Sequence, residues 1–243
     1  MTTRYIPKAL RPVPLGLFER AMALGRHLPG KPGHICNRKL KRRLCRRAPD
    51  VFARVLADTR PGDLCIDLGA NVGAITAQMA ATGADVISFE PDPATFDALL
   101  ANTAAYPTVT CVQKAAGARA DQLMLHRRAS WSADDPLRTS QASSLVRKGA
   151  GMSDAKSVMV EVVDFVDYLT ALDRDTRVLK MDIEGSEWDL MEALLASPVL
   201  ARIDCMFVET HERVDPQVNI PRFNRLCARA ETLDRPYINL YWQ

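Results

Sequence analysis

The chain has 243 residues, of which 47% are hydrophobic and 25% charged, a composition typical of a globular protein and not of a disordered or fibrous one. Its longest uncharged stretch, Leu68 to Ala84, is interrupted by glycines and polar residues and is too short to cross a membrane. The N-terminus lacks the apolar core and cleavage site of a secretory signal, so we expect a cytoplasmic protein without a transmembrane segment.

The net charge of +3 conceals an uneven distribution. Residues 1–50 carry 13 Lys or Arg and two acidic residues, so the rest of the chain is acidic. The densest basic segment is NRKLKRRLCRR, Asn37 to Arg47. It forms either a solvated helix face or a binding surface for a phosphorylated substrate, an anionic lipid or RNA. No aromatic residue is interleaved there, which disfavours RNA stacking, and a lipid contact would place the protein at a membrane periphery.

The six cysteines are predicted to be reduced residues of the core. No two of them have the spacing of a zinc motif or a redox pair. A metal site built from His34, Cys36 and Cys45 would lack a fourth ligand, so structural zinc is not expected.

Residues 1–60 are predicted to form a basic, Pro-rich N-terminal arm with helical segments, and residues 61–243 to form the main domain. From Pro61 onward, short apolar runs alternate with helix-like periodicity, which is typical of a Rossmann-like, doubly wound α/β fold with a mainly parallel sheet. The strands expected in this sheet are Leu64–Asp67, Asp85–Glu90, Thr108–Gln113, Arg177–Asp182, Ile203–Glu209 and Tyr237–Trp242.

Residues 121–163 depart from this alternation. Two strand-like runs, DQLMLHR and VMVEVV, flank a polar, turn-rich stretch, so we expect an inserted hairpin with a long surface loop that acts as a lid. Ser143 and Ser144 lie in this loop, where ordinary turn chemistry explains them better than substrate contact.

Two short patterns predict helix starts. Asp92 can cap a helix that has Pro93 at its first position. Ser186 and Asp189 have the spacing of a capping box and precede an apolar helix.

The turn after the first expected strand, DLGANVG, contains the first candidate binding residues. Gly69 and Gly73 allow a ligand to approach the backbone beyond the strand end. Asp67 would repel a pyrophosphate but suits the cationic amino group of a methionine, so the charge favours S-adenosylmethionine over NAD. Glu90, at the end of the second strand, stands where a carboxylate can accept hydrogen bonds from both ribose hydroxyls.

Four segments together resemble the FkbM family of S-adenosylmethionine-dependent methyltransferases: DLGANVG, SFEPDP, LKMDIEGSEWDLM and FVETHE. The resemblance implies a class I methyltransferase fold, with a seven-stranded sheet that contains one antiparallel strand, and O-methylation of a small molecule such as a sugar or polyketide hydroxyl. It places Asp67, Gly69, Asn71, Gly73 and Glu90 at cofactor positions. No carboxylate follows the third strand, so the backbone or Gln113 would contact the adenine.

A hydroxyl acceptor must lose its proton as it attacks the methyl group. Asp182 ends the fourth strand of the parallel series, and Glu209 and His211 end the fifth, on the same rim of the sheet. We predict His211 as the general base, with Asp182 orienting the acceptor or the sulfonium; Mg²⁺ bound by Asp182, Glu209 and His211 is an alternative. Glu184 and Glu187 lie near the start of a predicted helix. Their charges could stabilise the N-terminus of that helix, and this interpretation is as good as a catalytic role.

Two other functions remain open. The basic arm would suit an RNA methyltransferase, although no Asn-Pro-Pro-Tyr-like motif follows the fourth strand. A non-catalytic cofactor-binding module would use the same arm to dock on a membrane or a partner. The leading hypothesis is O-methylation of a hydroxyl on a sugar, glycolipid or natural product.

Overall fold

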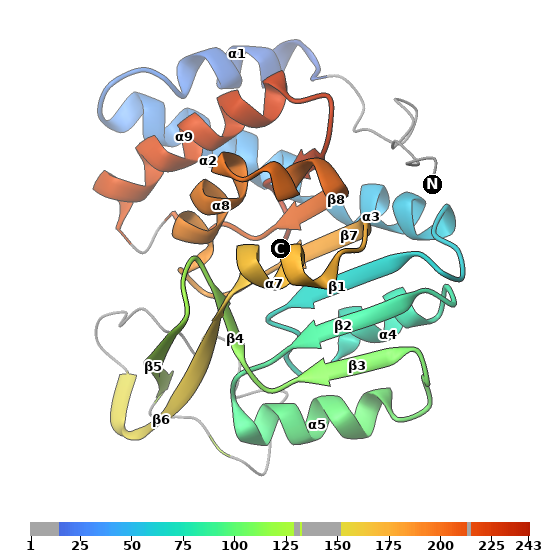
Figure 1. The fold of residues 1–243 in the computed structure, drawn as a ribbon. Helices are drawn as coiled ribbons and strands as arrows, with labels where there is room; N and C mark the ends of the chain where they lie inside the picture. The colour runs from blue at the N-terminus through green and yellow to red at the C-terminus, as the bar shows by residue number, and fades with distance from the viewer. Residues whose placement is uncertain (1–14, 129–131, 133–151, 213–214) are drawn as a thin grey trace.

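The computed structural model describes residues 15–128, 132, 152–212 and 215–243. Its centre is a sheet of six strands in the order β3-β2-β1-β7-β8-β9, drawn with the arrowheads on one side in Figure 1. The strands are β1 (Leu64–Leu68), β2 (Asp85–Phe89), β3 (Val109–Val112), β7 (Thr176–Met181), β8 (Ile203–Val208) and β9 (Tyr237–Asn239). Every adjacent pair is parallel, so all the strands end at one rim.

The prediction of seven strands with one antiparallel member is wrong for this sheet. The central sheet of the described chain has six strands, and its last strand, β9, is parallel to β8. The helix α9 (Pro216–Thr232) connects the two, and a helical crossover returns the chain in the same direction. Residues 240 and 241 after β9 form a turn. The predicted strands are otherwise present, although the last is shorter than expected.

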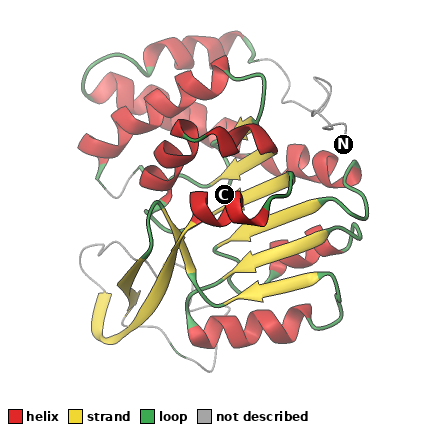
Figure 2. Ribbon diagram, viewed as in Figure 1, coloured by secondary structure: helices red, strands yellow, loops and turns green. Residues whose placement is uncertain are grey.

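Helices cover both faces of the sheet, as the doubly wound prediction requires (Figure 2). Side chains of α3 (Ala48–Ala57) and α4 (Ala74–Ala80) form one apolar core with alternate strand residues such as Cys65 and Val178. Side chains of α7 (Phe165–Leu172), α8 (Glu187–Ala196) and α9 form the other, with Ile66 and Leu179. Strand residues alternate between the two covered faces, so nearly every residue of the inner strands β1, β2, β7 and β8 is buried, which explains their continuous apolar runs.

The described N-terminal part of the chain forms helices. Helices α1 (Leu17–Gly25) and α2 (Lys31–Cys45) form an antiparallel pair above the sheet (Figure 1). Glu19, near the start of α1, pairs with Arg47, just beyond the end of α2, at 2.7 Å. Within the described part of the chain, no helix has both the length and the apolar content needed to span a bilayer.

A second sheet, in the order β4-β6-β5, adjoins the strand ends. It consists of β4 (Ala115–Gly117), β5 (Asp121–Arg128) and β6 (Met152–Asp164), and β5 and β6 pair antiparallel. The predicted hairpin is therefore confirmed. The predicted lid with Ser143 and Ser144 lies outside the described residues.

The two predicted helix starts have different outcomes. Asp92 caps α5 (Pro93–Thr103) by accepting a hydrogen bond from the backbone N–H of Ala94 at 3.0 Å, as predicted. The predicted capping box is wrong, because the Ser186 side chain makes no cap hydrogen bond to α8; the neighbouring Glu187 carboxylate accepts one from the Gly185 N–H instead. All six cysteines are free; Cys45, Cys65, Cys205 and Cys227 are buried as predicted, whereas Cys36 and Cys111 are only partly buried.

Candidate active site

A cavity of about 450 Å³ lies beyond the carboxyl ends of the central strands, where ligands bind in open parallel sheets. Five strands of the central sheet or the turns after them contribute to it, together with α5, β4, β5 and the last residue. It is lined by Gly69, Asn71, Phe89, Glu90, Pro91, Asp92, Thr95, Lys114, Ala115, Ala116, Leu125, Asp182, Ile183, Glu184, Glu209 and Gln243. Polar and apolar side chains thus line the same cavity.

The turn after β1 has the backbone conformation that its glycines predict. Gly69 has φ +72°, and a Cβ there would lie 1.8 Å from the carbonyl oxygen of Asp182, so only glycine fits between the two strand ends. Asn71 also has a positive φ of 51° and lines the cavity. Gly73 does not line it: a Cβ there would press on Leu99, so this glycine allows α4 and α5 to pack closely.

Glu90 occupies the end of β2 at the cavity wall. One carboxylate oxygen accepts a hydrogen bond from the Asn71 N–H and the other from the Asp92 N–H, both at 2.9 Å. Burial raises the pKa of Glu90 to about 7, against the opposing effect of these two hydrogen bonds. Each carboxylate oxygen keeps a lone pair for another donor.

Asp67 lies behind this wall and does not line the cavity. It is fully buried, pairs with Lys180 of β7 at 3.1 Å and accepts a hydrogen bond from the Thr76 hydroxyl at 2.8 Å. The Lys180 ammonium also donates to the carbonyl of Gly69 at 2.8 Å. Strand alternation explains the placement, since Asp67 points to the face covered by α4. Asp67 therefore supports the turn through Lys180.

The second sheet is tied to the cavity by a buried ion pair. Arg127 of β5 donates to both carboxylate oxygens of Asp92, at 2.6 and 2.7 Å. This contact holds Leu125 of the same strand in the cavity lining. Gln113 is exposed and lies outside the lining, whereas the next residue, Lys114, lies in it.

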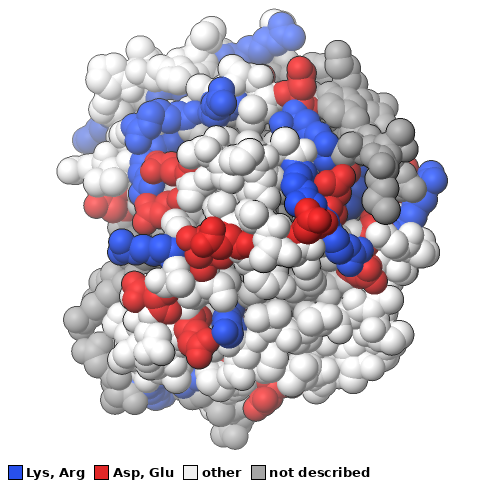
Figure 3. Space-filling view, in the orientation of Figure 1, with Lys and Arg blue, Asp and Glu red and all other residues white. Residues whose placement is uncertain are grey.

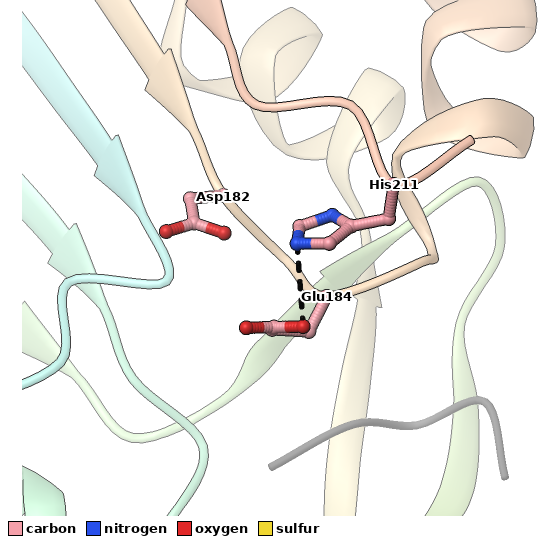
Figure 4. A group of neighbouring side chains, drawn as sticks. All are labelled: Asp182, Glu184 and His211. Carbon is pink, nitrogen blue, oxygen red and sulfur yellow. Dashed lines mark ion pairs between the residues drawn. The ribbon is translucent and has the colours of Figure 1, made fainter. Parts of the chain in front are cut away.

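Four ionisable side chains meet at the ends of β7 and β8. Ligand atoms of Asp182, Glu184 and His211 all lie within 4.8 Å of one another (Figure 4). The Nε2 atom of His211 is 3.3 Å from a Glu184 oxygen and 3.8 Å from a Glu209 oxygen. The structure thus brings the three predicted catalytic residues together and adds Glu184, which has a positive φ of 54°.

The partner that orients His211 is Glu187, for which the sequence leaves a helix charge and a catalytic role both open. Glu187 is fully buried, and one oxygen accepts hydrogen bonds from the His211 N–H at 2.8 Å and from Nδ1 at 2.9 Å. The other accepts from the Gly185 N–H at 2.6 Å. Burial opposes the charge, but the contacts with His211 outweigh it and lower the pKa of Glu187. With Nδ1 as the donor, Nε2 faces Glu184 and Glu209.

The segment that carries His211 is also held from the N-terminal side. The ammonium of Lys41, on α2, donates to the carbonyl of Thr210 at 2.7 Å and pairs with Glu212 at 2.6 Å. Lys41 and Glu212 are both buried. The basic segment therefore contributes one residue to the support of the site, which its charge pattern alone could not distinguish from the exposed cations beside it.

The rim carboxylates bind protons more tightly than usual. Burial, followed by repulsion from Asp182, raises the pKa of Glu209 to about 7. Burial also raises the pKa of Asp182, although Lys180 opposes this. One Asp182 oxygen is buried without a hydrogen-bond partner in the described chain. A buried carboxylate oxygen without a partner can accept a proton or hold a cation.

Comparisons with known proteins point to one family. A family model described as a methyltransferase FkbM domain matches residues 67–229, about two thirds of the chain. The chain is similar to the hexuronic acid methyltransferase AglP of Haloferax volcanii, with 25% identity over 170 residues, 69% of this chain and 64% of the relative. It thus spans less than two thirds of that relative's length. The comparison with solved structures found no match.

Proposed function

Because the chain belongs to the FkbM methyltransferase family, we propose that it transfers a methyl group from S-adenosylmethionine to a sugar oxygen. One observation carries the proposal: the cavity has the Gly69 turn and Glu90 on one wall and the acidic residues beside His211 on another. A donor and an acceptor held on these walls would meet at the ends of β1 and β7. Holding two reactants in line supplies much of the catalysis of such a displacement.

The residues at the strand ends fit the donor. Glu90 has free lone pairs for two ribose hydroxyls, and Gly69 and Asn71 bring backbone to the cavity wall. Asp182 places a carboxyl group at the cavity wall, where it suits a cationic sulfonium. The bound donor would supply an electrophilic methyl group, which needs no redox chemistry from the protein.

The acceptor's proton would pass to His211. Glu187 holds Nδ1, so Nε2 is the atom with a lone pair for a hydroxyl proton. Glu184 and Glu209 lie next to Nε2 and stabilise the imidazolium that forms. The same carboxylates repel an acceptor carboxylate, which favours a hydroxyl as the site of methylation.

A metal-assisted reaction is a second candidate. Asp182, Glu184 and His211 offer two carboxylates and one imidazole within 4.8 Å, and Glu187 backs the imidazole as carboxylates do behind metal-bound histidines. Glu184 replaces Glu209 in the predicted set. If Mg²⁺ serves, a chelator abolishes methyl transfer and added Mg²⁺ restores it; activity that survives the chelator leaves His211 as the base.

The sugar acceptor is proposed from the relative, whose name assigns it a hexuronic acid. The proposal is tested first by calorimetric titration with S-adenosylhomocysteine, and binding at micromolar affinity is expected. Glu90→Gln should weaken it, whereas Glu231→Gln, an exposed change on α9 outside the cavity lining, should not. Binding of NAD in place of S-adenosylhomocysteine would overturn the proposal, and methylation of RNA alone would favour the RNA alternative. A non-catalytic module would retain its role after His211→Ala.

A further inference from the structure

The helix pair α1–α2 presents an apolar stripe to solvent. Leu17, Ala21 and Leu24 recur at helical spacing along α1, and all three are exposed; Leu17 is 87% and Leu24 78% exposed. Leu28, in the turn after α1, extends the stripe and is 54% exposed. A globular helix buries such a stripe, so its exposure here indicates a surface that contacts something apolar.

A basic stripe runs along α2. Lys39, Arg42 and Arg46 recur at helical spacing, with Arg38 beside them, and all four are exposed. None of the four forms an ion pair with a described residue. The acidic residue of the described helix pair, Glu19, is only 2% exposed, so no exposed carboxylate on α1 or α2 offsets the four cations.

The two stripes lie on the same face of the helix pair. The contact between the helices includes Phe18 of α1 and the Arg43 guanidinium of α2, which lies 4.4 Å from the ring centre. Leu17 and Arg42 each precede a contact residue by one position. Moving back by one residue rotates the side-chain direction by about 100° around the helix axis. In two antiparallel helices that face each other, this rotation turns both side chains toward the same side of the pair, so Leu17 and Arg42 point the same way. Figure 3, viewed as in Figure 1, shows Lys/Arg and Asp/Glu interspersed over the side of the molecule that it draws.

We propose that this face docks on an anionic phospholipid membrane. Apolar side chains at helical spacing beside unpaired cations match a bilayer interface, where Leu enters the acyl boundary and Lys or Arg meets the phosphates. RNA would use the cations but gives Leu17 and Leu24 no apolar partner. The other side of α2 carries Lys41, which holds the Thr210–Glu212 segment beside His211. The docked face is therefore one helix away from the candidate active site.

The test is co-sedimentation of the full chain with phosphatidylcholine vesicles, with and without phosphatidylglycerol. Binding is expected only with phosphatidylglycerol and should fall as salt rises. The double variant Lys39→Gln/Arg42→Gln should lower the partition coefficient about 30-fold. Leu24→Ser should lower it about tenfold. Unchanged thermal melting of each variant establishes that the loss is not unfolding.

Matched changes on other helices serve as controls. Arg225→Gln on α9 removes an exposed cation, and Leu100→Ser on α5 removes an exposed leucine. Both should bind vesicles as the parent does. Equal loss in the controls, equal binding to vesicles without phosphatidylglycerol, or RNA that displaces the protein while Leu24→Ser binds normally would each overturn the proposal. Sedimentation requires no methyl transfer, so its result is independent of the proposed reaction.

Discussion

Replacing Glu187 by glutamine tests whether this buried carboxylate orients the proposed base. Glu187 accepts three hydrogen bonds, two from His211 on one oxygen and one from the Gly185 N–H on the other. An amide has one acceptor oxygen, so if that oxygen stays on His211 the NH₂ group faces the Gly185 N–H. The variant loses one charge-assisted hydrogen bond and places two donors, the glutamine NH₂ and the Gly185 N–H, against each other. Together these changes should lower the free energy of unfolding by about 3 kcal/mol. The two remaining bonds also weaken without the charge.

The catalytic effect should exceed the structural one. Without the carboxylate, His211 loses the partner that keeps Nδ1 as donor and stabilises the imidazolium, so kcat should fall about 100-fold or more. Affinity for S-adenosylhomocysteine should stay within about twofold, because Glu187 does not line the cavity. The assays are urea unfolding, calorimetry and methyl transfer, with Asp189→Asn as the control: it is the same type of change at an exposed position on α8. A kcat that equals that of the control would refute the orienting role.

Three further changes test neighbouring parts of the site. His211→Ala should lower kcat about 10²- to 10⁴-fold with S-adenosylhomocysteine affinity unchanged by calorimetry, and a small loss of kcat would exclude it as the base. Lys180→Met leaves Asp67 charged and unpaired, so urea unfolding should show a loss of about 3–5 kcal/mol; a neutral result would contradict the supporting role of the pair. Because the pKa of Glu90 is raised from 4.5 to about 7, the folded state holds its proton more tightly, and stability falls as pH rises through this window. Between pH 4.5 and 7, the free energy of unfolding of Glu90→Gln should decrease by up to about 3 kcal/mol less than that of the parent. The same pH profile in both proteins would show that the carboxylate titrates normally.

Much of the fold followed from local patterns. The buried apolar runs predicted the strands, because both faces of a parallel sheet are covered, and Asp92 with Pro93 predicted a helix start. The direction of the last strand, β9, could not be predicted from local patterns. Its direction depends on the crossover through α9, which joins distant segments, and not on the residues of the strand.

Some positions in the candidate site could also be predicted from the sequence. Glu90, Asp182 and Glu209 stand at strand ends and line one cavity, because parallel strands share a rim. Asp67 was expected at the ligand but lies behind the wall. Its strand neighbours show why: alternation turns it toward α4, where Thr76 and Lys180 meet it. Each of these contacts joins segments that no local pattern connects.

The supporting residues gave the weakest signals. Glu187 begins a helix, so its sequence position fits a charge on the dipole as well as a partner for His211. Lys41 lies among cations of similar spacing, and only burial against Thr210 and Glu212 distinguishes it. Burial of single polar residues depends on packing between distant elements.

The most direct test of the account is methyl transfer from methyl-labelled S-adenosylmethionine to hexuronic acid glycosides, with the product analysed by NMR. The account predicts a base-stable methyl ether on a ring hydroxyl, formed by the parent and lost in His211→Ala. A base-labile methyl ester would contradict hydroxyl transfer, and a parent that binds S-adenosylhomocysteine but transfers label to RNA and to no sugar would contradict the proposed acceptor.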